Sequence, residues 1–448
     1  MLKQVQHDMP VRFWSFCHPE LVSGSRFLGF KAPPCGRGSL LIINWKGYNN
    51  QNVRRQHMEI IELKKGVYWV GAIDWNVRDF HGYSTPHGTT YNAYLILDEK
   101  NVLVDTVKSP FYLEMLGRIS EIIDPSRIDV IVSNHVEMDH SGSLSPIVDR
   151  IGNPLVITSE KGKKGLEKHY QRSLNFKTVK TGDVFPIGHR TLTFVEAPML
   201  HWPDSMFTYI KEDQLLLPND AFGQHFASCQ RFEDEVGDGV MKHAAKYYAN
   251  ILWPLAPLIL RKVDEVVKMG IPIDMIAPSH GLIWRKDPGR IIQAYVDWSQ
   301  GKAGRKILIV YDTMWGSTES IAKAILKGLI EEKVDAKLLH LRSNHRSDII
   351  HEMLDTQGIL LGSPTLNNGM FPTMGDFLTY MRGLRPKGKV FGLFGSHGWG
   401  GGAVKEMRKS LEEGKFEIWE KDLQIQYLPT PEELDKAVQF GKEFAKKF

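Results

Sequence analysis

The stretch His135-Val136-Glu137-Met138-Asp139-His140 places four side chains of metal-ligand type within six residues. It comes shortly after Ile128–Val132, a short apolar run of the kind that forms a buried strand. A loop at the end of a strand can direct such side chains into one cavity. The sequence therefore predicts a metal site at the end of this strand, and the alternative, an ordinary acidic loop, explains the clustering less well.

Three further residues of the same type occur downstream, in loop-like settings next to proline or glycine or just after an apolar run. Seven such side chains suffice for two metal ions that share one carboxylate. Carboxylates and imidazoles without a thiolate suit iron, manganese or zinc rather than copper(I). Three carboxylates and one hydroxide would also balance the charge of two ferrous ions. The candidate ligands are His135, Glu137, Asp139, His140, His201, Asp220 and His280.

The chain around this cluster alternates between strand and helix patterns. Tyr91–Leu97 and Val102–Asp105 are expected to pair as strands around a turn at 98–101. A helix is expected at 111–123 and further strands at 191–195 and 214–217. Strands interspersed with helices over residues 58–302 predict an α/β sandwich.

The character of the sequence changes after a polar, glycine-containing linker at 299–305. Apolar runs at 306–311, 358–361 and 390–394 alternate with segments of helical spacing. This alternation predicts a doubly wound parallel sheet for residues 303–448. The chain is therefore divided into an extension at 1–57, a metal domain at 58–302 and a second α/β domain at 303–448.

Each of these three apolar runs is followed by a loop that could hold a ligand. Residues 312–318 combine hydroxyl groups, a glycine and the start of a helix, where backbone N–H groups and the helix dipole favour phosphate. The pattern GxxxxGK[ST] is absent, which excludes an ATP-binding P-loop. Ligands of open α/β sheets bind at the carboxyl ends of the strands. The candidate residues are Thr313, Met314, Trp315, Gly316, Ser317, Thr318, Pro364, Thr365, Leu366, Asn367, Asn368, Ser396, His397, Gly398, Trp399, Gly400 and Gly401.

The order His135-x-Glu137-x-Asp139-His140, His201, Asp220, His280 resembles the flavodiiron proteins, also called A-type flavoproteins. The resemblance runs from about residue 64 to the C-terminus. It implies an αββα sandwich of the metallo-β-lactamase type, followed by a flavodoxin-like domain. Hydrolytic members of that sandwich fold carry His-x-His-x-Asp-His and bind zinc. Glu137 stands in place of the second histidine here, as in the iron-binding branch.

The resemblance also implies a role for each metal-site residue. One iron would take His135, Glu137 and His201, the other would take Asp139, His140 and His280, and Asp220 would bridge them. In some family members the residue that matches His140 is turned away and replaced by water. His81 and Tyr248 resemble residues next to the metals that donate hydrogen bonds or protons, and an ordinary buried polar role stays open for both.

The loop Thr313-x-x-Gly316-x-Thr318 resembles the phosphate loop of flavodoxins, so FMN is the expected second cofactor. By the same resemblance, 365–368 and 396–401 would flank the flavin ring, and Trp399 would stack on it. The implied activity is reduction of O2 to water, of NO to N2O, or of both, at two irons supplied with electrons by FMN. Two alternatives stay open: a dizinc hydrolase fused to a flavodoxin domain, and a non-catalytic electron carrier or gas sensor.

The resemblance further implies partners. In this family the two cofactors of one chain lie too far apart for fast electron transfer, so a head-to-tail homodimer or a dimer of dimers is expected. The chain lacks the rubredoxin or flavin-reductase modules that some members append. A separate donor is therefore expected, with rubredoxin as first choice and a reduced deazaflavin as second.

Composition bounds the remaining possibilities. The chain has 448 residues, 42% of them hydrophobic, which is ordinary for a globular protein. Its net charge of +4 comes from the first 57 residues, so the body indicates no nucleic-acid partner. No apolar stretch approaches the roughly 18 residues of a membrane span, and no signal peptide is recognised, so a cytoplasmic enzyme is expected. Residues 1–57 are expected to be dispensable for the fold, with Met58 a possible start.

Overall fold

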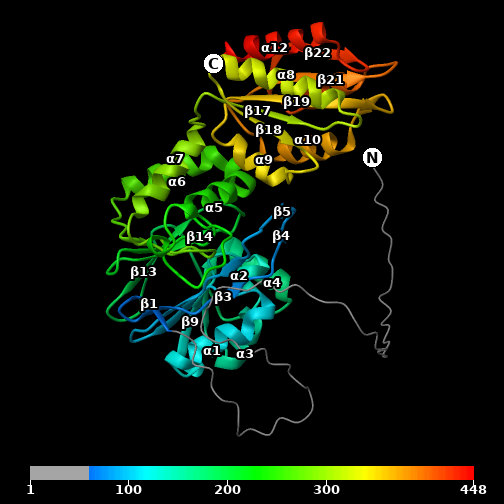
Figure 1. The fold of residues 1–448 in the computed structure, drawn as a ribbon. Helices are drawn as coiled ribbons and strands as arrows, with labels where there is room; N and C mark the ends of the chain where they lie inside the picture. The colour runs from blue at the N-terminus through cyan, green and yellow to red at the C-terminus, as the bar shows by residue number, and fades with distance from the viewer. Residues whose placement is uncertain (1–59) are drawn as a thin grey trace, which may run out of the picture. The chain divides into compact units, whose positions relative to one another are not determined.

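Two β-sheets packed face to face form the metal-ligand part of the chain. The structure, a computed structural model, describes residues 60–448 (Figure 1), and the expectations for residues 1–57 and Met58 lie outside that range. The first sheet has the order β1-β2-β7-β8-β9-β10-β11. Its strands are β1 Ile61–Lys64, β2 Val67–Trp69, β7 Tyr94–Ile96, β8 Asn101–Val104, β9 Ile128–Val132, β10 Leu155–Ser159 and β11 Phe176–Val179.

The second sheet has the order β12-β13-β14-β15-β16. Its strands are β12 Val184–Pro186, β13 Thr191–Glu196, β14 Met206–Ile210, β15 Leu215–Leu217 and β16 Met275–Ile276. Two short ribbons complete the strands of this part: β3 Ala72–Asp74 with β6 Thr89–Tyr91, and β4 Asp79–Phe80 with β5 Tyr83–Ser84. The expected pairing of the strands around the turn at 98–101 is confirmed, since β7 and β8 pair antiparallel.

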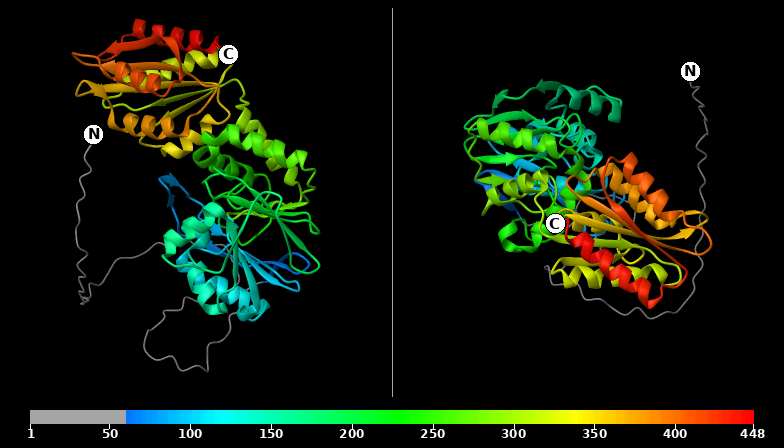
Figure 2. Two further views of the ribbon diagram at one scale, coloured as in Figure 1. Left: turned by 180° about the vertical axis from the view of Figure 1, so that it is seen from behind. Right: turned by 90° about the horizontal axis from the view of Figure 1, so that it is seen from above.

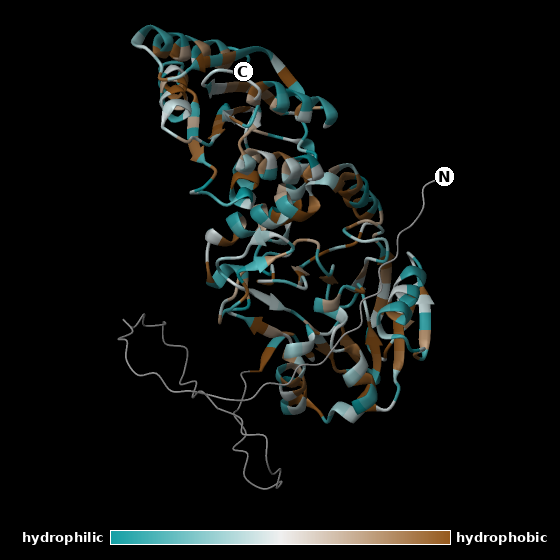
Figure 3. Cartoon of the chain, turned by 90° about the vertical axis from the view of Figure 1, so that its right-hand side faces the viewer, coloured by the Kyte–Doolittle hydropathy of each residue, from teal (hydrophilic) through white to brown (hydrophobic). Residues whose placement is uncertain are grey.

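Helices cover the outer face of each sheet. Along β8 and β9, Val102, Val104 and Val132 face the core between the sheets, whereas Leu103 and Ile131 face a second core beneath the helices. This period-two division buries both faces of the central strands, which explains why Ile128–Val132 is almost entirely apolar. Figure 3 shows apolar residues concentrated in these strands. The helices over the first sheet are α1 Tyr112–Ile122, α3 Leu144–Ile151 and α4 Glu160–Tyr170, and those over the second are α5 Gly239–Tyr247, α6 Ala256–Lys268 and α7 Pro288–Gln300.

The C-terminal part is a parallel sheet with the strand order β18-β17-β19-β21-β22, to which β20 adds a short antiparallel pairing with β19. All other pairings in it are parallel. The order matches the flavodoxin-like 2-1-3-4-5 arrangement, with its switch point between β17 and β19. Its strands are β17 Lys306–Tyr311, β18 Asp335–His340, β19 Gly358–Leu366, β20 Gly369–Met370, β21 Val390–His397 and β22 Glu417–Gln426.

Helices lie on both faces of this sheet as well (Figures 1 and 2). Ile307 and Ile309 of β17 pack beneath α8 and α12, and Leu308 and Val310 pack on the opposite side with α9, α10 and α11. The predicted fold class, a metallo-β-lactamase-like αββα sandwich followed by a flavodoxin-like sheet, is therefore confirmed. The helices are α8 Ser317–Glu331, α9 Arg346–Met353, α10 Pro372–Leu384, α11 Ala403–Glu413 and α12 Pro431–Ala445.

Two strands of this sheet run further than expected. β19 continues to Leu366 and β21 to His397, so residues 362–366 and 395–397 lie in strands rather than in loops. The parallel pairing continues because Gly362 lies beside Phe394: a Cβ at Gly362 would come within 2.1 Å of the Phe394 ring. Within residues 60–448, no helix is both long and apolar enough to cross a membrane.

Candidate metal centre and flavin cleft

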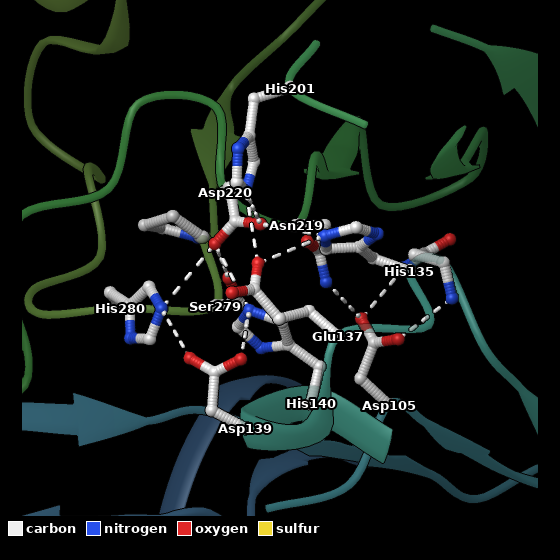
Figure 4. Close-up of polar contacts among 12 residues, drawn as sticks. Asp105, His135, Glu137, Asp139, His140, His201, Asn219, Asp220, Ser279 and His280 are labelled. Atoms are coloured by element: carbon white, nitrogen blue, oxygen red, sulfur yellow. Dashed lines mark hydrogen bonds and ion pairs between the residues drawn. The ribbon is translucent and has the colours of Figure 1, made fainter. Parts of the chain in front are cut away.

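The seven candidate metal ligands converge at one edge of the sandwich (Figure 4). The segment that follows β9 carries four of them, and it includes the short helix α2, Met138–Ser141. The other three come from the loop between β13 and β14, the loop after β15 and the loop after β16. Strands far apart in sequence end at this edge, which brings the seven side chains together, and all but the partly buried His201 are buried.

The seven residues divide into two groups around Asp220. Ligand atoms of His135, Glu137, His201 and Asp220 lie within 4.8 Å of one another, and so do those of Asp139, His140 and His280. Oδ2 of Asp220 lies 3.4 Å from His201 Nε2 and 3.7 Å from His135 Nε2. Its Oδ1 lies 3.1 Å from His140 Nε2 and 3.4 Å from His280 Nε2. Each carboxylate oxygen therefore faces one group, which is the arrangement of a bridging ligand.

Hydrogen bonds orient two of the imidazoles. His135 Nδ1 lies 2.9 Å from Asp204 Oδ2, and His280 Nδ1 lies 2.7 Å from the carbonyl oxygen of Thr90. An Nδ1–H that donates to these acceptors leaves the Nε2 lone pair free to bind a metal. The His140 ring is also turned inward, with its Nε2 3.4 Å from Asp139 Oδ1.

The chemistry of this donor set fits two cations. Neither ring nitrogen of His140 has a hydrogen-bond partner among the described residues, and the nearest charged partners of the Asp139 carboxylate are His140 and His280 of the same cluster. Burial lowers the pKa of His280, but its hydrogen bonds to Asp139 and Asp220 outweigh this and raise the pKa to about 10. Such a concentration of buried negative charge is stabilised by bound cations.

Polar residues that sequence reasoning missed hold the ligand loops in place. Asp105, at the end of β8, accepts hydrogen bonds from the Asn134 backbone N–H at 2.7 Å and from Asn219 Nδ2 at 3.2 Å. It thereby ties together the residues that precede His135 and Asp220. The available signal was its position, since β8 lies beside β9 and ends at the same edge.

The loop of His280 is fixed from a different strand. Asn92 Nδ2 donates to the carbonyl oxygens of Pro278, at 2.8 Å, and Gly281, at 3.1 Å. Trp69 Nε1 in turn donates to Asn92 Oδ1 at 2.8 Å. The segments around Trp69 and Asn92 therefore position a metal ligand that lies far away in the sequence.

Replacing Asp204 by asparagine should reduce the affinity of the centre for metal by about 10–100-fold. The carboxylate of Asp204 holds His135 through Nδ1 and also accepts the Val136 backbone N–H at 2.8 Å. An amide keeps the shape but removes the charge that favours this ring orientation. Metal content after dialysis against a chelator measures the effect, and a variant that keeps its metals as wild type does would contradict it.

A second cleft, of about 840 Å³, lies at the carboxyl ends of β17, β19 and β21. Fourteen of the seventeen residues proposed from sequence line it, together with Tyr427 and Leu428, which were missed because they follow β22. Gly316, Thr318 and Gly401 do not line it. Gly316 instead starts α8 with a φ of 88°, and the buried Thr318 Oγ1 lies 2.7 Å from Ser396 Oγ. The side chains of Trp315 and Trp399 are 91% and 92% exposed at its rim.

Comparisons with known proteins agree with both sites. Residues 89–281 match the family described as "ODP family beta lactamase", and residues 309–441 match "Flavodoxin". The chain is 48% identical to a "Nitric oxide reductase" of Moorella thermoacetica over 390 residues, which cover 86% of this chain and 98% of that protein. It is 42% identical to an oxidase of a reduced coenzyme from Methanothermobacter marburgensis over 395 residues, covering 86% and 97% of the two chains.

Solved structures give the same answer. Rubredoxin oxygen:oxidoreductase from Desulfovibrio gigas superposes with a TM-score of 0.85 at 37% identity, covering 87% of this chain and 98% of that one. The flavodiiron protein from Giardia intestinalis does so with a TM-score of 0.85 at 36% identity, covering 88% and 97%. The chain belongs to the flavodiiron protein family. It is accordingly an oxidoreductase.

Of the two residues expected beside the metals of this flavodiiron protein, the structure places only His81 there. His81 Nε2 lies 2.7 Å from Glu137 Oε1, and this hydrogen bond raises the pKa of His81. The prediction for Tyr248 is wrong. Its hydroxyl lies 2.7 Å from Ser299 Oγ, and its ring packs against Tyr295 and Trp298.

Tyr247 occupies the position expected for Tyr248. Its hydroxyl donates to Asp220 Oδ1 at 3.1 Å. Successive residues of a helix point about 100° apart, and Tyr247 ends α5 where a π-helical turn, Tyr248–Leu252, begins. One residue of register therefore decides which tyrosine reaches the centre. The tyrosine pair was visible in the sequence, but its helical phase was not.

Proposed function

We propose that this flavodiiron protein reduces NO, O2 or both at a di-iron centre that receives its electrons from FMN. The observation that carries the proposal is Asp220, whose two oxygens face two separate groups of nitrogen and oxygen donors. Glu137 adds a hard oxygen ligand where hydrolytic members of the fold carry histidine, which favours iron over zinc. The proposed partition is His135, Glu137 and His201 on one iron, Asp139, His140 and His280 on the other, and Asp220 between them.

Two irons, when bound, supply single electrons and Lewis acidity to a small gas molecule, and FMN accepts electrons in pairs and releases them singly. The protein's own groups orient the site and provide hydrogen-bond donors. Tyr247 stays protonated at neutral pH because burial, together with the nearby Asp220 carboxylate, raises its pKa well above the usual value. His81 presents an exposed ring next to Glu137, where it can hold a proton close to the open side of the centre.

In the C-terminal domain, the loop 313–318 is proposed to hold the FMN phosphate. Backbone N–H groups at the start of the 15-residue helix α8 provide the positive end of a helix dipole. Thr313 Oγ1 accepts the Gly316 N–H at 3.1 Å and thereby shapes this turn. The segments 364–368 and 396–401 are proposed to flank the flavin ring, with Trp399 stacked on it.

Introducing a negative charge into this turn with Ser317→Asp should weaken FMN binding by at least about tenfold. The new carboxylate would compete for the N–H groups of α8 and repel the phosphate. Flavin absorbance per chain after dialysis measures the loss. Thr379→Asp makes a similar change on α10, outside the cleft, and should keep its flavin. Equal flavin retention by both variants would argue against this phosphate site.

The exposed rim of the cleft supports the proposed assembly. Trp315, Trp399 and Leu428 are large apolar side chains exposed beside the flavin site, and a second copy in a head-to-tail homodimer, or in a dimer of dimers, would cover them. A separate electron donor is also proposed. The name of one solved relative points to rubredoxin as the donor, and that of another relative points to a reduced coenzyme, for which a reduced deazaflavin is the proposed choice. The proposed compartment is the cytoplasm.

The deciding experiment is anaerobic reduction of the purified full-length protein, followed by O2 or NO consumption at an electrode, with iron and FMN measured on the same sample. Consumption of at least one gas is expected. A sample replete in both cofactors that consumes neither gas would refute the proposal. A dizinc hydrolase is distinguished by zinc in place of iron together with turnover of a β-lactam or phosphodiester.

A further inference from the structure

A small polar cavity of about 170 Å³ opens beside the metal centre. Its lining changes from the outside inward. Pro86, His87 and Lys242 are exposed at the mouth, whereas Tyr83, Thr85, His225 and Tyr247 are buried at the inner end. The cavity therefore leads from the protein surface to residues that contact metal ligands.

Three buried polar atoms on its wall lack a hydrogen-bond partner among the described residues. They are the Tyr83 hydroxyl, the Thr85 hydroxyl and His225 Nε2, and the side chains concerned are 2%, 2% and 6% exposed. Buried polar groups in folded proteins are nearly always satisfied, either by protein or by ordered water. Three such groups on one cavity indicate a site built for small polar molecules, with room for several waters.

The inner end of the cavity reaches the metal centre through Tyr247. The hydroxyl of this lining residue donates to Asp220 Oδ1 at 3.1 Å. His225 is held from the other side, since its Nδ1 lies 2.7 Å from Thr89 Oγ1. Its unpartnered Nε2 is thus free to bond to a molecule in the cavity.

The charged groups near the mouth are partly neutralised. Lys246 Nζ lies 2.5 Å from Asp348 Oδ1 and donates to Ser84 Oγ at 2.7 Å. Burial, together with the nearby His87 and lysines, lowers the pKa of His243 to about 4, so that this ring is neutral at physiological pH. Water is therefore favoured over an anion as the occupant, although Lys242 keeps one cation at the entrance.

We propose that this cavity holds a chain of water molecules that carries protons from solvent to the Tyr247 side of the metal centre. The inference rests on the proposed function, because reduction of these gases consumes protons. O2 takes four electrons and four protons to give two waters, and two NO take two electrons and two protons to give N2O and one water. The electrons come from reduced FMN, which the external donor refills.

The first test is a high-resolution crystal structure of the wild-type protein. Ordered waters bonded to Tyr83, Thr85 and His225 are expected. A dry cavity would overturn the proposal, and so would an anion bound to these three groups. This readout does not depend on turnover, so it still decides the cavity if the protein consumes neither gas and the proposed function fails.

The second test uses Thr85→Val and Tyr83→Phe, which remove one unpartnered hydroxyl each with little change in shape. Both should lower turnover by about tenfold and increase the solvent isotope effect, with the KM for the gas unchanged. Thr356→Val is the control, since it removes a buried hydroxyl that bonds to the Glu352 carbonyl at 2.7 Å, outside the cavity. Wild-type turnover and an unchanged isotope effect in both cavity variants would overturn the proposal.

Discussion

Asp220→Asn is expected to abolish turnover and to leave the centre without its full pair of metal ions. Asp220 is the residue whose two oxygens face both ligand groups, at 3.1–3.7 Å from four imidazole nitrogens. An amide offers one oxygen and no charge, so it cannot link two cations. The loss in metal affinity should exceed the roughly 100-fold upper range seen for residues behind the ligands.

Metal content per chain and gas consumption by the reduced protein measure this effect. Asp213→Asn is the matched control, because Asp213 pairs with Arg190 Nε at 2.7 Å, away from the centre, and its variant should keep both metals. If Asp220→Asn bound two irons as tightly as wild type and still consumed gas, Asp220 would not be the bridge.

The second large effect is expected from Glu137→His. This change restores the His-x-His-x-Asp-His pattern of the hydrolytic branch and removes one of the three buried carboxylates. With one negative charge fewer and a nitrogen ligand in place of oxygen, the site should shift from iron to zinc. Zinc has no redox chemistry, so gas reduction should fall by at least about 100-fold. His81 would also lose the carboxylate that its Nε2 contacts at 2.7 Å.

The iron-to-zinc ratio of protein produced with both metals present measures this shift, alongside gas consumption. Glu160→His makes the same substitution at an exposed helix position and should leave the ratio unchanged. An iron-loaded, active Glu137→His variant would show that the glutamate does not select the metal. The remaining ligands would then have to account for the choice.

Much of both sites could be predicted because their signals are local. His135 to His140 follow a buried strand within a few residues, and the turn 313–318 joins β17 directly to α8. In each case the end of one strand sets the direction of the loop. The same reasoning placed three loops at one edge of the C-terminal sheet, where fourteen of the proposed residues line the cleft.

The errors arose where longer-range geometry decides. Tyr247 and Tyr248 are adjacent, and only the phase of α5 determines which one reaches Asp220. The loops after β19 and β21 begin later than expected because neighbouring strands continue to pair beyond Gly362 and Phe394. Asp105, Asn92 and Asp204 were missed because their partners lie 29 to 189 residues away in the chain.

The sequence by itself determined the chemistry of this protein: which donor atoms are present, in what order, and on which strand ends and loops. These properties depend on neighbouring residues and on strand and helix periodicity. The tertiary structure alone decided that Asp220 faces both ligand groups, that Tyr247 rather than Tyr248 contacts it, and that a polar cavity reaches it. Such relations depend on how distant segments pack against one another, and packing is set by the whole core rather than by any single stretch of the chain.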